Sequence, residues 1–345
     1  MNQMSPKKIK QQMLVIGSGF HSQVLGAKAG LLASWTELLD EVALEVGLKP
    51  SIYAVSQPTT AWEQLLSDFS KRKQQRHLKV HIAEERLKRV TSDIIIREEN
   101  KRARSYKENA FNVLLKSRLA LGGIHLLSLN FDQLIYRDIE DSLYIDRKFK
   151  HKAFYGKLTD LRSDDLDLIY NRELIESKNN INSYIWHPHG SEKKYKSLRL
   201  GLRDYAIMPG SYVYAFNEFK AWERTLLKRN LTKNTNEPLT ASDHKILLDR
   251  IHEWDSGKIH KKELNADNWV TRFMLLPVRF IGVGLSVEEI GLRWLINQRQ
   301  RNLSRINKQD SQFIYTRMKK PELIPWGCVI QDFESWDSAW TNTFI

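Results

Sequence analysis

Short runs of apolar residues recur along the chain, and each ends at a glycine or a polar residue. The runs that we expect to be strands lie at 12–17, 124–129, 184–186, 275–282, 312–316 and 326–330. Helical periodicity occurs between them, as in 31–47, where Gly47 and Pro50 follow the last apolar position. Short apolar strands that alternate with helices are typical of a mostly parallel sheet covered on both faces. The pattern therefore predicts an α/β fold.

Two long, charged stretches, 60–120 and 204–265, show helical patterns and no strong strand pattern. The polar run 230–238 interrupts the second stretch and reads as a loop. We find no internal repeat and no low-complexity tract. We therefore expect one domain over 1–345, with large helical insertions at about 60–120 and 204–265.

Composition narrows the class of protein. Of the 345 residues, 41% are hydrophobic and 28% are charged, which is ordinary for a folded globular chain and not for a disordered one. No apolar run approaches the roughly 20 residues needed to cross a bilayer. The apolar patch 13–16 is also shorter than the apolar region of about 7–15 residues in a signal peptide. We expect a cytoplasmic location without membrane association.

The formal net charge of +13 leaves two interpretations open. Basic residues are densest in 71–105 and 299–319, which is compatible with an acidic partner or a polynucleotide. Acidic residues are interleaved in the first block, as expected for solvated helix faces with pairs four residues apart. The single cysteine, Cys328, excludes an intramolecular disulfide and the usual thiolate zinc sites. We expect no metal.

Polar and glycine-rich segments follow four of the predicted strands. Open α/β sheets bind their ligands beyond the carboxyl ends of the strands, which is where these segments would lie. We therefore predict one nucleotide site made from these strand ends. Its candidate residues are Gly17, Ser18, Gly19, Phe20, His21, Asn130, Asp132, His189, Gly282, Gly284, Leu285 and Ser286.

The two glycine-rich turns each have a functional and a structural interpretation. Around Gly17 and Gly19, backbone N–H groups could approach phosphate oxygens, and the following helix N-terminus favours anions. The motif is incomplete because Ser22 replaces the last glycine of the dinucleotide fingerprint, and a tight turn explains it equally well. The turn 282–286 could bind a ribose or adenine edge, or simply join a strand to a helix.

The polar side chains have alternatives as well. Asn130 could hold a water or a ribose hydroxyl, or cap the helix that we expect to begin near Asp132. Asp132 could face a cationic ligand or be a residue of that helix N-terminus. His189, which precedes a glycine, is a general base or an interior imidazole. Glu289 lies in the first turn of a predicted helix, where the dipole favours acids without any function.

Taken together, the ordered motifs resemble the SIR2-like, sirtuin-related family. The matching segments are 17–21, Trp35 with Leu38 and Leu39, 129–132, 189–191, 282–286 and the closing run 326–330. Two positions depart from the family pattern: His21 stands where the family has Ser, and Leu129 where it has Thr.

The resemblance implies a Rossmann-like domain that binds NAD as a substrate and cleaves its nicotinamide–ribose bond. In that family Asn130 would position the ribose and the attacking water, His189 would be the catalytic histidine, and the first glycine turn would hold the pyrophosphate region. The single cysteine excludes the family's zinc ribbon. The chain is therefore similar to the zinc-free bacterial defence branch, in which NAD+ hydrolysis during infection depletes NAD.

Such an activity would be toxic unless it were gated, so we expect a co-encoded regulatory or sensor protein, for example a nucleotide-sensing one, or a homo- or hetero-oligomer. The basic segment 71–105 is a candidate docking surface. Two alternatives remain: a non-catalytic SIR2-like module that senses NAD or ADP-ribose and controls a partner, and a nucleic-acid-binding protein. The sequence does not distinguish linear from cyclic ADP-ribose as the product.

Overall fold

The computed structural model describes residues 11–26, 29–50, 57–71, 79–107, 109–135, 145–146, 168–170, 172–177, 180–228, 237–285, 289–306, 312–315 and 329–331. The strands in this part of the chain form one sheet in the order β3-β4-β5-β2-β1-β6-β7-β8. Their bounds are β1 Gln12–Ile16, β2 Ile124–Ser128, β3 Ile145–Asp146, β4 Glu173–Ile175, β5 Ser183–Trp186, β6 Val278–Ile281, β7 Gln312–Tyr315 and β8 Val329–Gln331.

The sheet is parallel from β5 through β8. At one edge β4 pairs antiparallel with β5, and β3 pairs antiparallel with β4. This confirms the predicted α/β class with a mostly parallel sheet. The antiparallel strand β4 was not predicted, because it has only three residues and begins with a glutamate. Of the last predicted strand, 329–330 is observed and 326–328 lies outside the described residues.

The central strands separate two hydrophobic cores. Leu14 and Ile16 of β1 contribute to one core, whereas Met13 and Val15 contribute to the other. Successive side chains of a strand point to opposite faces, so a strand covered on both faces needs apolar residues throughout. This explains the unbroken apolar run that identified β1 in the sequence.

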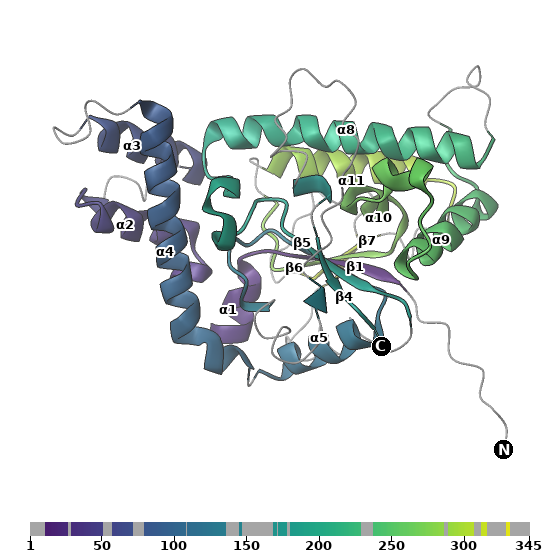
Figure 1. Cartoon of the computed structure of the whole chain (residues 1–345), viewed down its shortest axis with the longest axis horizontal. Coiled ribbons are helices and arrows are strands. Elements are labelled where there is room, and N and C mark those ends of the chain that lie inside the picture. The colour runs from purple at the N-terminus through teal and green to yellow at the C-terminus, as the bar shows by residue number, and fades with distance from the viewer. Residues whose placement is uncertain are drawn as a thin grey trace.

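Helices cover both faces (Figure 1). The core containing Leu14 is closed by α1 Gly19–Leu25, the 3-10 turn η2 Gly30–Leu32, α2 Trp35–Glu45, α3 Pro58–Ser70, α4 Val80–Lys107 and α5 Ala110–Leu121. The core containing Met13 is closed by α8 Leu202–Leu226, α9 Ala241–Asp255, η5 Lys261–Ala266, α10 Trp269–Leu275 and α11 Ile290–Asn302. Another 3-10 segment, η4 Glu192–Ser197, packs against α4. Among the described helices, none has both the length and the apolar character needed to span a bilayer.

Two predicted boundaries were wrong. The expected helix 31–47 begins as α2 at Trp35, because the Ser34 side chain caps it by accepting from the Glu37 N–H at 3.2 Å. The expected strand 275–282 begins only at Val278. Leu275 still belongs to α10, and Pro277, which disfavours helix in the residue before it, separates helix from strand.

Candidate active site

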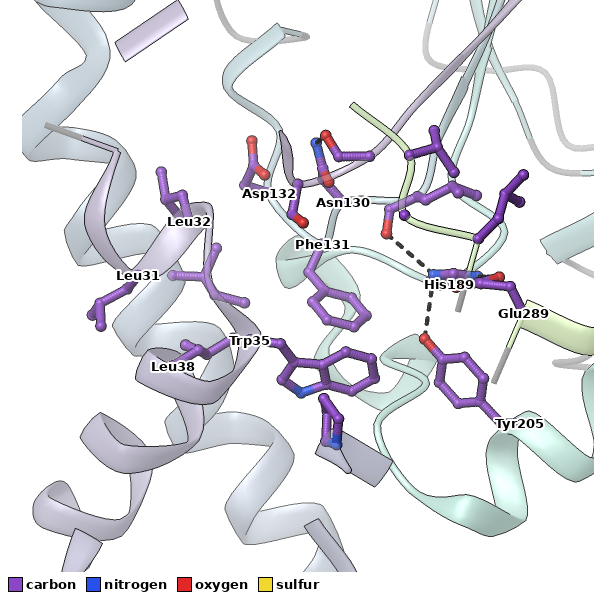
Figure 2. Close-up of a pocket in the computed structure, with 18 of the residues that line it drawn as sticks. Leu31, Leu32, Trp35, Leu38, Asn130, Phe131, Asp132, His189, Tyr205 and Glu289 are labelled. Carbon is purple, nitrogen blue, oxygen red and sulfur yellow. Dashed lines mark hydrogen bonds and ion pairs between the residues drawn. The ribbon is translucent and has the colours of Figure 1, made fainter. Parts of the chain in front are cut away.

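A cavity of about 400 Å³ lies beyond the carboxyl ends of β1, β2, β5 and β6 (Figure 2). Its strand-end wall consists of Gly17, Ser18, Leu129, Asn130, Phe131, Asp132, His189, Val283, Gly284 and Leu285. The remaining wall comes from helices and the residues next to them: Leu31, Leu32, Trp35, Leu38, Gln57, Pro58, Ile95, Tyr205 and Glu289. The sheet order reverses between β1 and β6, which is where open α/β sheets bind their ligands.

The structure brings most of the predicted site residues together. Those that line the cavity are Gly17, Ser18, Asn130, Asp132, His189, Gly284 and Leu285. Gly19, Phe20, His21 and Gly282 are not among its lining residues, and Ser286 lies outside the described residues. Asn130 and His189 lie 59 residues apart, in two different loops. They nevertheless share one cavity, as their proposed joint role requires.

Three of the glycines are explained by packing where β1 and β6 end. A Cβ atom on Gly17 would lie 2.7 Å from the Gly282 oxygen, and one on Gly282 would lie 2.2 Å from the Phe20 nitrogen. A Cβ atom on Gly19 would also meet the Gly282 oxygen, at 2.9 Å. The N–H groups of Gly17 and Gly19 donate to main-chain oxygens of this second strand end. The tight-turn interpretation therefore suffices for these glycines.

Gly284 is different. A Cβ atom there would meet nothing within 4 Å, and its backbone has no positive φ. The residue is exposed and lines the cavity. The space beside Gly284 is therefore open, so of the glycines that line the cavity it is the one best suited to close approach by a ligand.

Asn130 belongs to a buried polar cluster behind the cavity wall. Its Nδ2 donates to the Gly17 oxygen at 3.3 Å and lies 3.0 Å from Nε2 of His21. The same His21 nitrogen lies 2.7 Å from Oδ2 of Asp132. Because Nδ2 is turned toward these groups, the Asn130 carboxamide oxygen is the part that can accept from a ligand.

Two opposing effects act on the Asp132 carboxyl. Burial raises its pKa, but the charge of His21 and its hydrogen bond act in the other direction. The net pKa lies below the ordinary value, so Asp132 is a carboxylate at neutral pH. Its other oxygen accepts from the Leu134 N–H at 3.1 Å, which holds the loop after β2 in place.

His189 is oriented by a main-chain oxygen. Its Nδ1 lies 3.1 Å from the Leu129 oxygen and 3.5 Å from the Tyr205 hydroxyl. A carbonyl oxygen only accepts, so Nδ1 carries the hydrogen and Nε2 of a neutral imidazole carries the lone pair. Within the described residues Nε2 makes no hydrogen bond, and Oε2 of Glu289 lies 3.5 Å away. His189 therefore presents a buried nitrogen base at the cavity wall.

The rest of the wall is apolar and aromatic. Trp35 packs edge-to-face on Phe131, with ring centroids 5.5 Å apart, and lies against Tyr205 at 5.6 Å. Figure 2 shows Leu31, Leu32 and Leu38 on the side away from His189, with the Trp35 and Phe131 rings between. Such a wall suits a planar ring, because aromatic rings favour edge-to-face or offset stacking.

The charged residues that line the cavity are acidic. Its ionisable acids are Asp132 and Glu289, and none of its lining residues is a lysine or an arginine. His187, the other histidine of this segment, points to Glu173 instead, with Nε2 3.8 Å from Oε2. No three His, Cys, Asp or Glu side chains converge on a possible metal position in the described ranges.

Helix α4 supports both loops that carry the candidate residues Asn130 and His189. Ser92 donates to the Glu192 oxygen at 2.6 Å, next to the His189 loop, and Glu99 accepts from the Gln133 N–H at 2.6 Å, next to the Asn130 loop. Several cations of this basic helix are paired within the chain: Lys88 with Asp204 at 3.0 Å, and Arg97 with Glu41 at 2.9 Å. The helix thus has a structural role at the site.

Sequence reasoning missed several residues of the wall. Glu289 had been assigned to the helix dipole alone, although it follows the last motif closely. Tyr205 and Ile95 come from the long helical stretches and carry no local signal, since only the docking of α8 and α4 brings them to the cavity.

A scan against protein-family models gives no match, and a search of curated proteins gives none either. The site is therefore defined by its geometry: a carboxamide and a tautomer-fixed imidazole in one cavity, faced by aromatic rings and two carboxylates.

Proposed function

We propose that this protein is an NAD+ glycohydrolase, which cleaves NAD+ into nicotinamide and ADP-ribose. The observation that carries the proposal is that Asn130 and His189 line one cavity at the strand-order reversal, with Nε2 of His189 available as a base. Without β3 and β4, the sheet order is β5-β2-β1-β6-β7-β8. When these six strands are renumbered along the chain, the order is 3-2-1-4-5-6, which is that of a Rossmann-like fold. The ordered SIR2-like motifs support the same assignment.

The proposed reaction needs orientation and electrostatics more than a strong nucleophile. The C1′–N bond breaks with its electron pair passing to the pyridinium, which leaves as neutral nicotinamide. A water forms the new C1′–O bond and gives a proton to Nε2 of His189. The sugar resembles an oxocarbenium ion in the transition state, so a placed water, the Asn130 carboxamide and nearby negative charge are suited to it.

The wall also suits the charged end of this substrate. The carboxylates of Asp132 and Glu289 favour a cationic ring, and the pyridinium of NAD+ is cationic. The rings of Trp35, Phe131 and Tyr205 offer it aromatic contact. We assign Gly284 to close contact with the dinucleotide, because it lines the cavity and the space that a Cβ atom would take there is open.

By the same resemblance, we propose that the activity serves anti-phage defence by depleting NAD and that a partner or an assembly gates it. A co-encoded sensor protein is the proposed partner. Full NAD+ hydrolysis by the isolated chain, without any partner, would contradict such gating.

The test is nicotinamide release from NAD+ by the purified chain, alone and with co-expressed neighbours. Asn130→Ala and His189→Ala should each lose the release, with a loss of about 10²–10⁴-fold for the acid–base residue. His187→Ala is the matched control, since this histidine faces Glu173 and does not line the cavity. Retained turnover in both site variants would remove the assignment of Asn130 and His189.

The same assay separates the alternative functions. Saturable NAD+ or ADP-ribose binding without nicotinamide release, with and without partners, would indicate a sensing module built on the same cavity. Binding to a DNA duplex that weakens steeply with salt would favour a nucleic-acid function.

A further inference from the structure

Two hydrogen-bond acceptors face one another at the cavity wall. Nε2 of His189 and Oε2 of Glu289 are 3.5 Å apart, and their side chains are only 3% and 15% exposed. Because Nδ1 of His189 donates to the Leu129 oxygen, Nε2 of the neutral ring has no hydrogen to give. A charged N–H···O⁻ hydrogen bond would be shorter, about 2.7–2.9 Å. Nε2 of His189 and Oε2 of Glu289 can therefore both accept hydrogen bonds from a ligand in the cavity.

A side chain of α11 is bonded to the turn that precedes Glu289 in the sequence. Leu285, which lines the cavity, has a left-handed backbone with φ of +47°, an unusual conformation for a leucine. Its oxygen accepts from Nε of Arg293 at 3.0 Å, which ties the end of the β6 turn to the second turn of α11. Strained residues of this kind are concentrated at ligand sites.

Groups from α8 pack near this carboxylate. Burial, and then the negative charge of Glu289, raise the pKa of the Tyr212 hydroxyl well above its ordinary value. Tyr212 therefore stays a neutral phenol beside Glu289.

Two adjacent acceptors match two adjacent hydroxyl donors, and a carboxylate that accepts from a ribose hydroxyl is a recurring solution in nucleotide sites. We propose that Glu289 and His189 together bind the cis-2′,3′-diol of a ribose, with one hydroxyl donating to each, so that the proton of the attacking water reaches Nε2 through the hydroxyl that His189 holds. The inference rests on the proposed function, since this ribose is the one whose glycosidic bond would be cleaved. It makes Glu289 a specificity-determining residue.

The test compares the binding of uncleavable dinucleotides by the full chain. The probe is carba-NAD, in which a cyclopentane replaces the nicotinamide ribose and keeps both hydroxyls, together with its two mono-deoxy counterparts. The wild type should bind the compound that lacks the hydroxyl facing Glu289 about 10–100-fold more weakly than carba-NAD, the range for a hydrogen bond to a charged group. The loss should be somewhat smaller for the compound that lacks the hydroxyl facing His189. Glu289→Gln should bind carba-NAD about tenfold more weakly and lose the preference for one hydroxyl.

Two further variants complete the design. Glu253→Gln, on an exposed carboxylate of α9, is the matched control and should bind all three compounds as the wild type does. Glu289→Asp keeps the charge but withdraws the carboxylate by one methylene. It gives the same readout if Glu289→Gln melts below the assay temperature.

The outcomes are distinct. An unchanged diol preference in Glu289→Gln, in a chain that releases nicotinamide from NAD+, overturns the diol assignment alone. A Glu289-dependent preference in a chain that never releases nicotinamide supports the diol assignment and rejects the hydrolase. A wild type that does not bind carba-NAD overturns both.

Discussion

The imidazole of His189 donates through Nδ1 to the main-chain oxygen of Leu129, 3.1 Å away. This bond joins the loop after β5 to the residue that follows β2. It also decides which nitrogen of the ring is left for chemistry, because the Leu129 oxygen accepts only from a ring nitrogen that carries hydrogen.

Replacing His189 by asparagine should separate the structural bond from the chemistry. The Asn Nδ2 takes the place of the imidazole Nδ1 and can still donate to Leu129, but no nitrogen base remains. We expect the free energy of unfolding to stay within about 1 kcal/mol of the wild type, and nicotinamide release to fall by about 10²–10⁴-fold. Chemical unfolding and the release assay measure the two effects. Wild-type turnover by His189→Asn would exclude a base role for the imidazole.

The buried pair of His21 and Asp132 should stabilise the loop that carries Asn130. His21→Ala leaves a buried carboxylate without its main partner, which typically costs about 3–5 kcal/mol. Adding Asp132→Asn removes the buried charge, so the double variant should be more stable than His21→Ala. Urea unfolding of the wild type, both single variants and the double variant gives the interaction free energy between His21 and Asp132. Strict additivity would mean that the 2.7 Å contact contributes nothing.

Glycine-to-alanine variants should distinguish packing from ligand approach. Gly282→Ala places its Cβ 2.2 Å from a main-chain nitrogen in a left-handed conformation, so it should destabilise more than Gly257→Ala. Gly257 is also left-handed but has open space, and its cost should be about 1–2 kcal/mol. Gly284→Ala should leave the melting temperature unchanged and weaken NAD+ turnover. Unaltered turnover in a folded Gly284→Ala variant would count against dinucleotide contact at that glycine.

A second buried cluster, at the opposite ends of the central strands, should make stability depend on pH. Nε2 of His125 lies 2.8 Å from Asp255, which also pairs with Arg272 at 2.7 Å. Burial lowers the pKa of His125 below its ordinary value of 6.5, although Asp255 acts the other way. Below about pH 6.5 the unfolded chain therefore binds a proton that the folded chain refuses, so stability falls as the pH falls.

The measurement is the free energy of unfolding in urea between pH 7.5 and 5. The contribution of His125 cannot exceed about 1.4 kcal/mol per pH unit. His125→Gln should reduce the slope, while His260→Gln, at an exposed position, serves as the control. Some slope should remain, because burial also lowers the pKa of His244. Equal slopes in both variants would show that His125 does not titrate on unfolding.

The sequence predicted the strands at the centre of the fold better than those at its edge. β1 and β2 are covered on both faces, so their burial requires a continuous apolar run that is visible without a structure. β4 is a three-residue strand between the edge strand β3 and β5, and no local pattern reveals it.

The candidate site shows the same division. Residues that directly follow a strand, such as Asn130 and His189, were predicted because strand ends converge in a parallel sheet. Tyr205 reaches the cavity only through the docking of α8, which local periodicity does not encode. The packing of Gly17 against Gly282 joins two turns more than 260 residues apart, and neither turn alone distinguishes this contact from a phosphate cradle.

Ser92 and Glu99 stand two turns apart on α4, and each holds one of the two site loops. Both loops are thus hydrogen-bonded to the same continuous helix. A shift of α4 that keeps both hydrogen bonds would therefore move the carboxamide loop and the imidazole loop together.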